Sequence, residues 1–110
     1  MAYDEDLANR IRPLLGDRKG LTEKKMFGGL AFLIGGNMAI AASGQGGILV
    51  RVDPDESEAL VESTPAQMME MRGRQMPGWL RVETADVATD DELAPWVERG
   101  VAYAGSLPPK

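Results

Sequence analysis

The fold is decided by residues 30–42, which read LAFLIGGNMAIAA. Two short apolar runs, 30–34 and 38–42, flank a Gly-Gly-Asn turn, and this combination is typical of a β-hairpin. A connection this short requires the two strands to be antiparallel neighbours, because parallel strands need a long crossover. The stretch therefore predicts the centre of an antiparallel sheet.

Further strands are predicted on both sides of this hairpin. Residues 48–52 follow a glycine-rich turn and alternate apolar and polar side chains, whereas residues 22–27 alternate only weakly and are not counted as a full strand. Segments 68–72 and 78–83 are also strand candidates, and a loop over 73–77 is expected to join them. The chain therefore supplies about five strands.

Three segments predict helices. The first has apolar side chains at helical spacing from Leu7 onward, and the second begins at Asp53, which precedes a proline. The third begins with the capping-box pair Thr89 and Glu92 and carries Trp96 on its apolar stripe. The order is α-β-β-β-α-β-β-α, with strands clustered rather than alternating with helices. It predicts an α+β fold with a mainly antiparallel sheet and helices packed on one face.

Length and composition predict one domain over residues 1–110 and exclude several kinds of chemistry. Cysteine and histidine are absent, so thiolate nucleophiles, the commonest general base and the commonest transition-metal ligands are missing. The glycine-rich turns lie between strands, whereas phosphate-binding loops open a helix. We therefore identify no catalytic residue, metal site or cofactor. The N-terminus lacks the apolar core of a signal peptide, so we expect a cytoplasmic protein without membrane contact.

The formal net charge of −5 weighs against direct binding of nucleic acid. If the sheet leaves one face open, basic residues in the predicted strands and hairpins would form an anion- or partner-binding surface there. The alternative is a solvated face on which glutamates pair with them. The six candidates are Lys24, Lys25, Arg51, Arg72, Arg74 and Arg81.

Two further groups of residues are assigned structural roles. Gly28 and Gly29 interrupt a strand-like run, which indicates a bend or bulge rather than a ligand-binding loop. Phe32, Trp79 and Trp96 are expected to anchor the core, because the few aromatic residues are too scattered for a base-stacking platform.

Several short motifs occur in order across nearly the whole chain. They are KKMFGGLAFL at 24–33, GNMA at 36–39, ILVRVD at 48–53, GW at 78–79 and AYA at 102–104. Together they resemble the N-terminal domain of the TfoX/Sxy family, known for competence regulators. The resemblance implies the element order given above and a stand-alone, single-domain member. It supplies no catalytic residue.

The resemblance, the acidic charge and the missing catalytic groups favour a non-enzymatic protein-interaction module. The resemblance implies a transcription or competence co-regulator of the TfoX/Sxy type. Its partner is expected to be a protein, and homodimerisation stays open. The alternative is a small-ligand or nucleotide-binding domain, or a degenerate enzyme, that uses the glycine turns and the basic strand residues.

Overall fold

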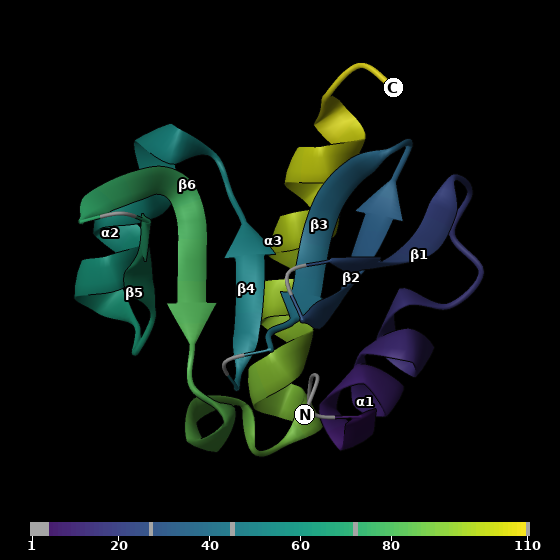
Figure 1. Cartoon of the computed structure of the whole chain (residues 1–110), viewed down its shortest axis with the longest axis horizontal. Coiled ribbons are helices and arrows are strands. Elements are labelled where there is room, and N and C mark those ends of the chain that lie inside the picture. Colours follow the sequence, from purple (N-terminus) through teal and green to yellow (C-terminus); the bar gives the residue numbers. More distant parts are fainter. Residues whose placement is uncertain (1–4, 27, 45, 72, 110) are drawn as a thin grey trace.

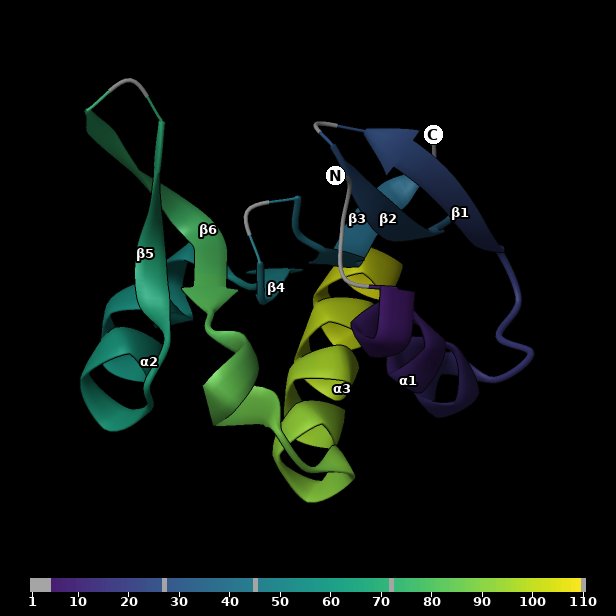
Figure 2. The same cartoon turned by 60° about the horizontal axis from the view of Figure 1, so that its bottom comes forward.

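The computed structural model describes residues 5–26, 28–44, 46–71 and 73–109. Within these residues the strands form one antiparallel sheet in the order β1-β2-β3-β4-β6-β5, and the helices pack on one side of it (Figures 1 and 2). The expected α+β class is confirmed. The elements are α1 (Glu5–Leu15), β1 (Leu21–Met26), β2 (Gly29–Ile34), β3 (Asn37–Ala42), β4 (Ile48–Arg51), the 3-10 helix η1 (Pro54–Glu56), α2 (Ser57–Ser63), β5 (Gln67–Met71), β6 (Arg74–Val82), the 3-10 helix η2 (Thr84–Val87) and α3 (Asp90–Ser106).

The sheet differs from the prediction in two details. It has six strands among the described residues, one more than expected, because the weakly alternating Leu21–Met26 forms a complete edge strand paired with β2. The loop expected over 73–77 is wrong, since these residues from Arg74 onward belong to β6. The ladder between β5 and β6 has a register shift between Met68 and Met69, and β6 bends there. Pro77 lies in this irregular part of the ladder, where its missing N–H leaves no cross-strand hydrogen bond unmade.

One row of side chains crosses five strands on the side of the helices. Phe32, Ile40, Val50 and Leu80 are fully buried and face one another as successive cross-strand partners, and Met68 continues the row on β5. Apolar side chains of α1 and α3 pack on this row in a single core. Each large apolar side chain buried in this way stabilises the fold by about 1.5–3 kcal/mol.

Helix α3 lies directly against β3. A Cβ atom on Gly100 would overlap the carbonyl oxygen of Ala39, so the helix reaches this depth only because residue 100 has no side chain. Trp96 is 5% exposed and Val97 is fully buried beside the same contact. Trp96 therefore lies in the core that its helical stripe predicted.

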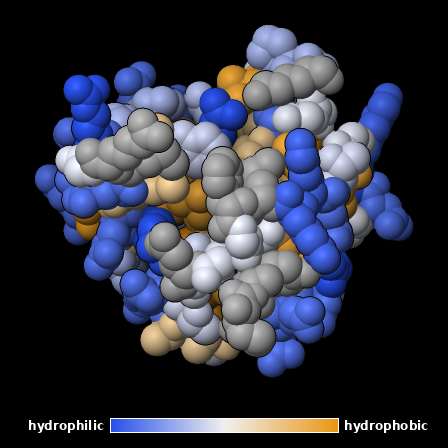
Figure 3. Space-filling model, viewed as in Figure 1, coloured by the Kyte–Doolittle hydropathy of each residue, from blue (hydrophilic) through white to orange (hydrophobic). Residues whose placement is uncertain are grey.

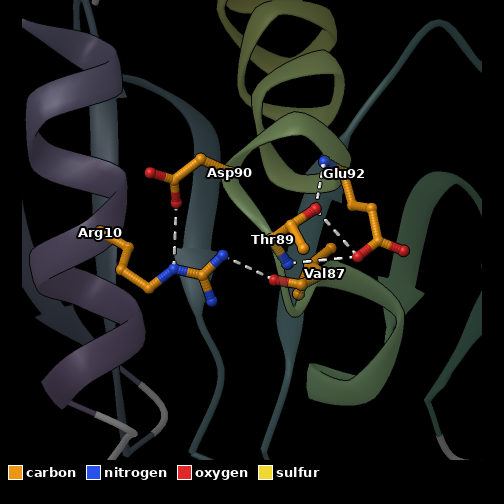
Figure 4. A network of polar contacts seen from close by, with 5 residues as sticks. All are labelled: Arg10, Val87, Thr89, Asp90 and Glu92. Carbon is orange, nitrogen blue, oxygen red and sulfur yellow. Dashed lines mark hydrogen bonds and ion pairs between the residues drawn. The ribbon is translucent and has the colours of Figure 1, made fainter.

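Figure 4 shows how the start of α3 is fixed to α1. Arg10 of α1 donates through Nη2 to the Val87 carbonyl oxygen at 2.8 Å and through Nε to the Asp90 carboxylate at 3.2 Å. Thr89 and Glu92 form the predicted capping box, in which each side chain accepts a hydrogen bond from the other residue's backbone N–H. The two hydrogen bonds of the capping box satisfy backbone N–H groups that would otherwise lack a partner at the helix N-terminus.

An ion pair joins α1 to the edge strand β1. Glu23 faces the helices because it is the cross-strand partner of Phe32, and Arg12 binds both of its carboxylate oxygens at 2.9 and 3.0 Å. The hydrogen bonds from Arg12 lower the pKa of the Glu23 carboxyl below its ordinary value, against a smaller opposing effect of desolvation. A charge on an edge strand that points toward the helices also discourages edge-to-edge association with other sheets.

We expect the Glu23→Gln variant to show a pH-dependent loss of stability. Because the pKa of Glu23 is lower in the folded chain, the ion pair stabilises the fold above the unfolded pKa of about 4.3 and loses this effect as the pH falls through the folded pKa. Both side chains are substantially exposed, so the loss at pH 7 should be about 0.5–1 kcal/mol. Urea denaturation at pH 7 and pH 2.5 checks this, and an equal loss at both values would contradict it.

We expect two Gly-to-Ala changes within α3 to act in opposite directions. Gly100→Ala should cost about 2–3 kcal/mol or more, because the new methyl group forces the helix away from β3. Gly105→Ala is the matched control: nothing lies within 4 Å of its Cβ position, and alanine favours the helix by about 0.5–1 kcal/mol. Denaturation midpoints measure both effects. A stable Gly100→Ala variant would show that α3 does not rest on β3.

Candidate functional site

The structure does not bring the six predicted basic residues into one patch. Lys24 and Arg81 lie on the sheet face away from the helices, in one cross-strand row that passes through Ala31, Ala41 and Leu49. Four strand spacings separate the two residues, which is about 19 Å. They therefore do not bind one small anion together.

The remaining predicted basic residues are distributed around the sheet. Lys25 is the cross-strand partner of the buried Leu30 and so lies on the side of the helices. Arg74 is exposed at the start of β6, and Arg72 lies outside the described residues. Arg51, at the end of β4, lies in a cluster with aromatic side chains.

Arg51 lies against two aromatic rings that come from different elements. Its Cζ atom is 5.1 Å from the centre of the Trp79 ring on β6 and 5.5 Å from the centre of the Tyr103 ring on α3. Arg51 and Trp79 are direct cross-strand partners, and the long arginine side chain extends from there to the helix. The guanidinium therefore connects the sheet to α3 where β4 ends.

The charge of Arg51 is not neutralised within the described part of the chain. No carboxylate there lies within ion-pair distance of its guanidinium, and it donates no hydrogen bond to those residues. Each ring contributes about 0.5–1 kcal/mol of cation–π attraction at a partly exposed site. The rings thus hold the side chain in place while its N–H donors face solvent or a bound acceptor.

Trp79 has a different place from the one expected. It is partly exposed and is not part of the buried core cluster, whereas Phe32 is fully buried and Trp96 nearly so. The bend in β6 explains the difference. Gly78 has a φ of +89°, and Trp79 follows it in register with Arg51, at a position that shares the face of Arg81 rather than that of Leu80.

A shallow groove of about 290 Å³ lies beside this cluster, between η1 and α3. Asp53 and Glu56 form one wall, while Arg99, Tyr103 and Ser106 of α3 form the other. Asp53 accepts a hydrogen bond from the Asp55 backbone N–H at 2.9 Å, which fixes its carboxylate at the start of η1. Tyr103 belongs to both features, since its ring also contacts Arg51.

The sequence reasoning missed the helical wall of this groove. Arg99, Ala102, Tyr103 and Ser106 are spaced at i, i+3, i+4 and i+7, which places them on one face of a helix. This spacing was visible in the sequence as a second stripe that runs beside the apolar one. Its partner across the groove was not visible, because η1 lies some forty residues earlier in the chain.

The described residues give no indication of a metal site or a membrane span. In the ranges that the structure describes, no three acidic side chains lie close enough together to hold a metal ion. Among the helices of those ranges, none is long and apolar enough to pass through a bilayer.

Gly28 and Gly29 are placed by two different backbone requirements. Gly28 has a φ of +75°, a backbone conformation that residues with a side chain rarely adopt. A Cβ atom built on Gly28 would have no neighbour closer than 4.0 Å. Gly29 has no such dihedral angle, but a Cβ atom on it would overlap the carbonyl oxygen of Ala42 on β3. The pair thus lets the chain turn into β2 and then pass close to β3.

A comparison with protein families agrees with this fold and its motifs. A family model described as the TfoX N-terminal domain matches residues 13–104 of the 110-residue chain. The chain belongs to the TfoX N-terminal domain family. This confirms the resemblance drawn from the motifs between residues 24 and 104. No curated protein matches the chain. The matched range of this TfoX N-terminal domain includes Arg51, Trp79 and Tyr103.

Alanine at the two glycines should separate their two backbone requirements. Gly28→Ala should cost about 1 kcal/mol, the usual penalty for a side chain at positive φ. Gly29→Ala should cost about 2–3 kcal/mol, because β2 and β3 must move apart to admit the methyl group. Chemical denaturation gives both values. Unchanged midpoints for both variants would overturn the structural assignment and favour a ligand-binding role for the turn.

Proposed function

We propose that this TfoX N-terminal domain is a non-enzymatic protein-interaction module, with a transcription or competence co-regulator of the TfoX type as its specific role. The surface proposed for the partner is the sheet face away from the helices together with Arg51, Trp79 and Tyr103. The observation that carries the proposal is this arginine–aromatic cluster. It is partly exposed and does not belong to the core.

The sheet face away from the helices offers a limited apolar contact area, because Ala31 and Ala41 on this face are buried. Leu33, Met38 and Leu49 point away from the helices, are only partly buried, and do not belong to the core cluster. Figure 3, which looks onto this face, shows small separate apolar areas between charged side chains. Apolar side chains bordered by polar ones are common at protein–protein contact sites.

The residue types in the cluster also support a protein partner. Arginine, tryptophan and tyrosine are the residues that most often dominate the binding energy of protein interfaces. Here the rings already hold the guanidinium of Arg51, so less conformational entropy is lost when a partner binds. Since no described carboxylate neutralises Arg51, the partner is proposed to present an acidic side chain to it.

The proposal is tested by capture on the immobilised protein, with bound proteins identified and quantified by mass spectrometry. A specific partner should be retained by the wild type and lost at least ten-fold with Arg51→Gln and with Trp79→Ala, as expected for interface residues of high energetic weight. Lys25→Gln is the matched control, because it removes one positive charge from the opposite side of the sheet. Circular dichroism confirms that each variant is folded.

Two results would contradict the proposal. One is capture that Arg51→Gln and Lys25→Gln reduce equally, which would indicate non-specific charge attraction. The other is a nucleotide that raises the unfolding free energy by about 2.7 kcal/mol at a hundred times its dissociation constant, which would establish the ligand-binding alternative.

A further inference from the structure

We propose that the groove between η1 and α3 binds an extended segment of a partner protein, about three residues long, that carries a basic and an acidic side chain. The inference rests on the proposed function, in that the occupant belongs to a protein partner. It adds a second contact site and the chemistry of the segment bound there.

The two walls of the groove carry opposite charges that do not pair with each other. Asp53 and Glu56 stand on the η1 side, and Arg99 stands on the α3 side. Within the described residues no ion pair joins Arg99 to either carboxylate. Opposite charges held apart across a groove suit an occupant that presents a cation to one wall and an anion to the other.

The guanidinium of Arg99 stacks on a ring of its own helix. Its Cζ atom lies 4.7 Å from the centre of the Trp96 ring, and Trp96 is only 5% exposed because it is packed in the core. The guanidinium therefore rests on a fixed aromatic surface and keeps its N–H donors for an acceptor in the groove. A carboxylate of the bound segment is such an acceptor.

The dimensions of the groove favour a short extended segment over an enclosed small molecule. Arg99 and Ser106 are seven residues apart on α3, which corresponds to about 10 Å along the helix axis. An extended chain covers that distance with about three residues. The groove has a volume of about 290 Å³, and its residues Glu56, Arg99 and Ser106 are exposed, so it is open to solvent. Small-molecule sites, in contrast, enclose most of their ligand.

The groove is continuous with the surface proposed above. Tyr103 lines the groove and also contacts Arg51, so a segment lying along α3 leads directly to the arginine–aromatic cluster. A partner that contacts the sheet face away from the helices can thus place a neighbouring segment of its chain in the groove. Exposed charge pairs contribute little individually, so we expect the groove to add specificity to binding more than affinity.

The test is a titration of the ¹⁵N-labelled protein with three capped tripeptides, followed by amide chemical shifts. Acetyl-Lys-Ala-Asp-amide and acetyl-Asp-Ala-Lys-amide carry both charges in opposite orders, and acetyl-Gln-Ala-Asn-amide is the neutral control. One charged peptide should shift the amides of Glu56, Arg99 and Tyr103 with a dissociation constant in the millimolar range, while the neutral peptide does not. Free L-alanine tests whether a zwitterionic small molecule is the true ligand.

Two variants show whether the walls act as proposed. Arg99→Gln and Glu56→Gln should each weaken binding of the charged peptide by about three- to five-fold, the effect of one exposed charge pair. Arg74→Gln, in the β5–β6 hairpin, should leave binding unchanged. Three results would each overturn the inference. The first is equal shifts with the charged and the neutral peptides, and the second is a response to L-alanine alone. The third is the absence of shifts at about 10 mM peptide, a concentration at which even one weak charge-pair contact should be detected.

The outcome is separable from that of the capture experiment. If a partner is captured through Arg51 and Trp79 but the tripeptides do not bind, the groove inference fails and the proposed function stands. If the tripeptides bind as expected while capture does not depend on Arg51 or Trp79, the proposed sheet-face surface fails and the groove stands.

Discussion

The close approach of α3 to β3 is the constraint on which the rest of this structure depends. Gly100 lets the helix backbone reach the Ala39 carbonyl, and at that depth Trp96 and Val97 fill the space above the sheet. Helix α1 then packs beside α3, where Arg10 holds the first turn of that helix through Asp90. The side chains of Phe32, Ile40, Val50 and Leu80 are thereby fully buried, and a domain of this size obtains one modest core.

The other face of the sheet carries the partly exposed side chains that are proposed for binding. Leu33 and Leu49 alternate with core residues along their strands, so the period of two that builds the core also places apolar side chains on the face away from the helices. Where β4 ends, Arg51 extends to Tyr103 on α3 and joins that face to the groove in front of η1. The cluster is thus a consequence of how the helix is seated, and it stabilises the fold only modestly because its rings are partly exposed.

Local patterns in the sequence were sufficient for the hairpin, the capping box of Thr89 and Glu92, and the core position of Trp96, because each depends on residues that are near one another in the chain. Three features depend on long-range packing and were not predicted. Residues 74–76 belong to β6 because they pair with β5, and Pro77 lies in the irregular part of the ladder that follows them. The sequence predicts Trp79 in the core, whereas in the structure the bend at Gly78 turns this side chain toward Arg51. The groove needs η1 and α3 side by side, which no spacing within either segment indicates.

The central claim is that Trp79 and Trp96 serve different purposes, the first for binding and the second for stability. The most direct test is to measure the unfolding free energies of Trp79→Ala and Trp96→Ala by denaturant titration under identical conditions. We expect Trp96→Ala to lose about 3–5 kcal/mol, as is usual for a buried aromatic side chain. Trp79→Ala should lose clearly less, about 1–2 kcal/mol, because its side chain is partly exposed and its contact with Arg51 is weak. Equal losses of several kcal/mol for both variants would show that Trp79 belongs to the core and would contradict the account.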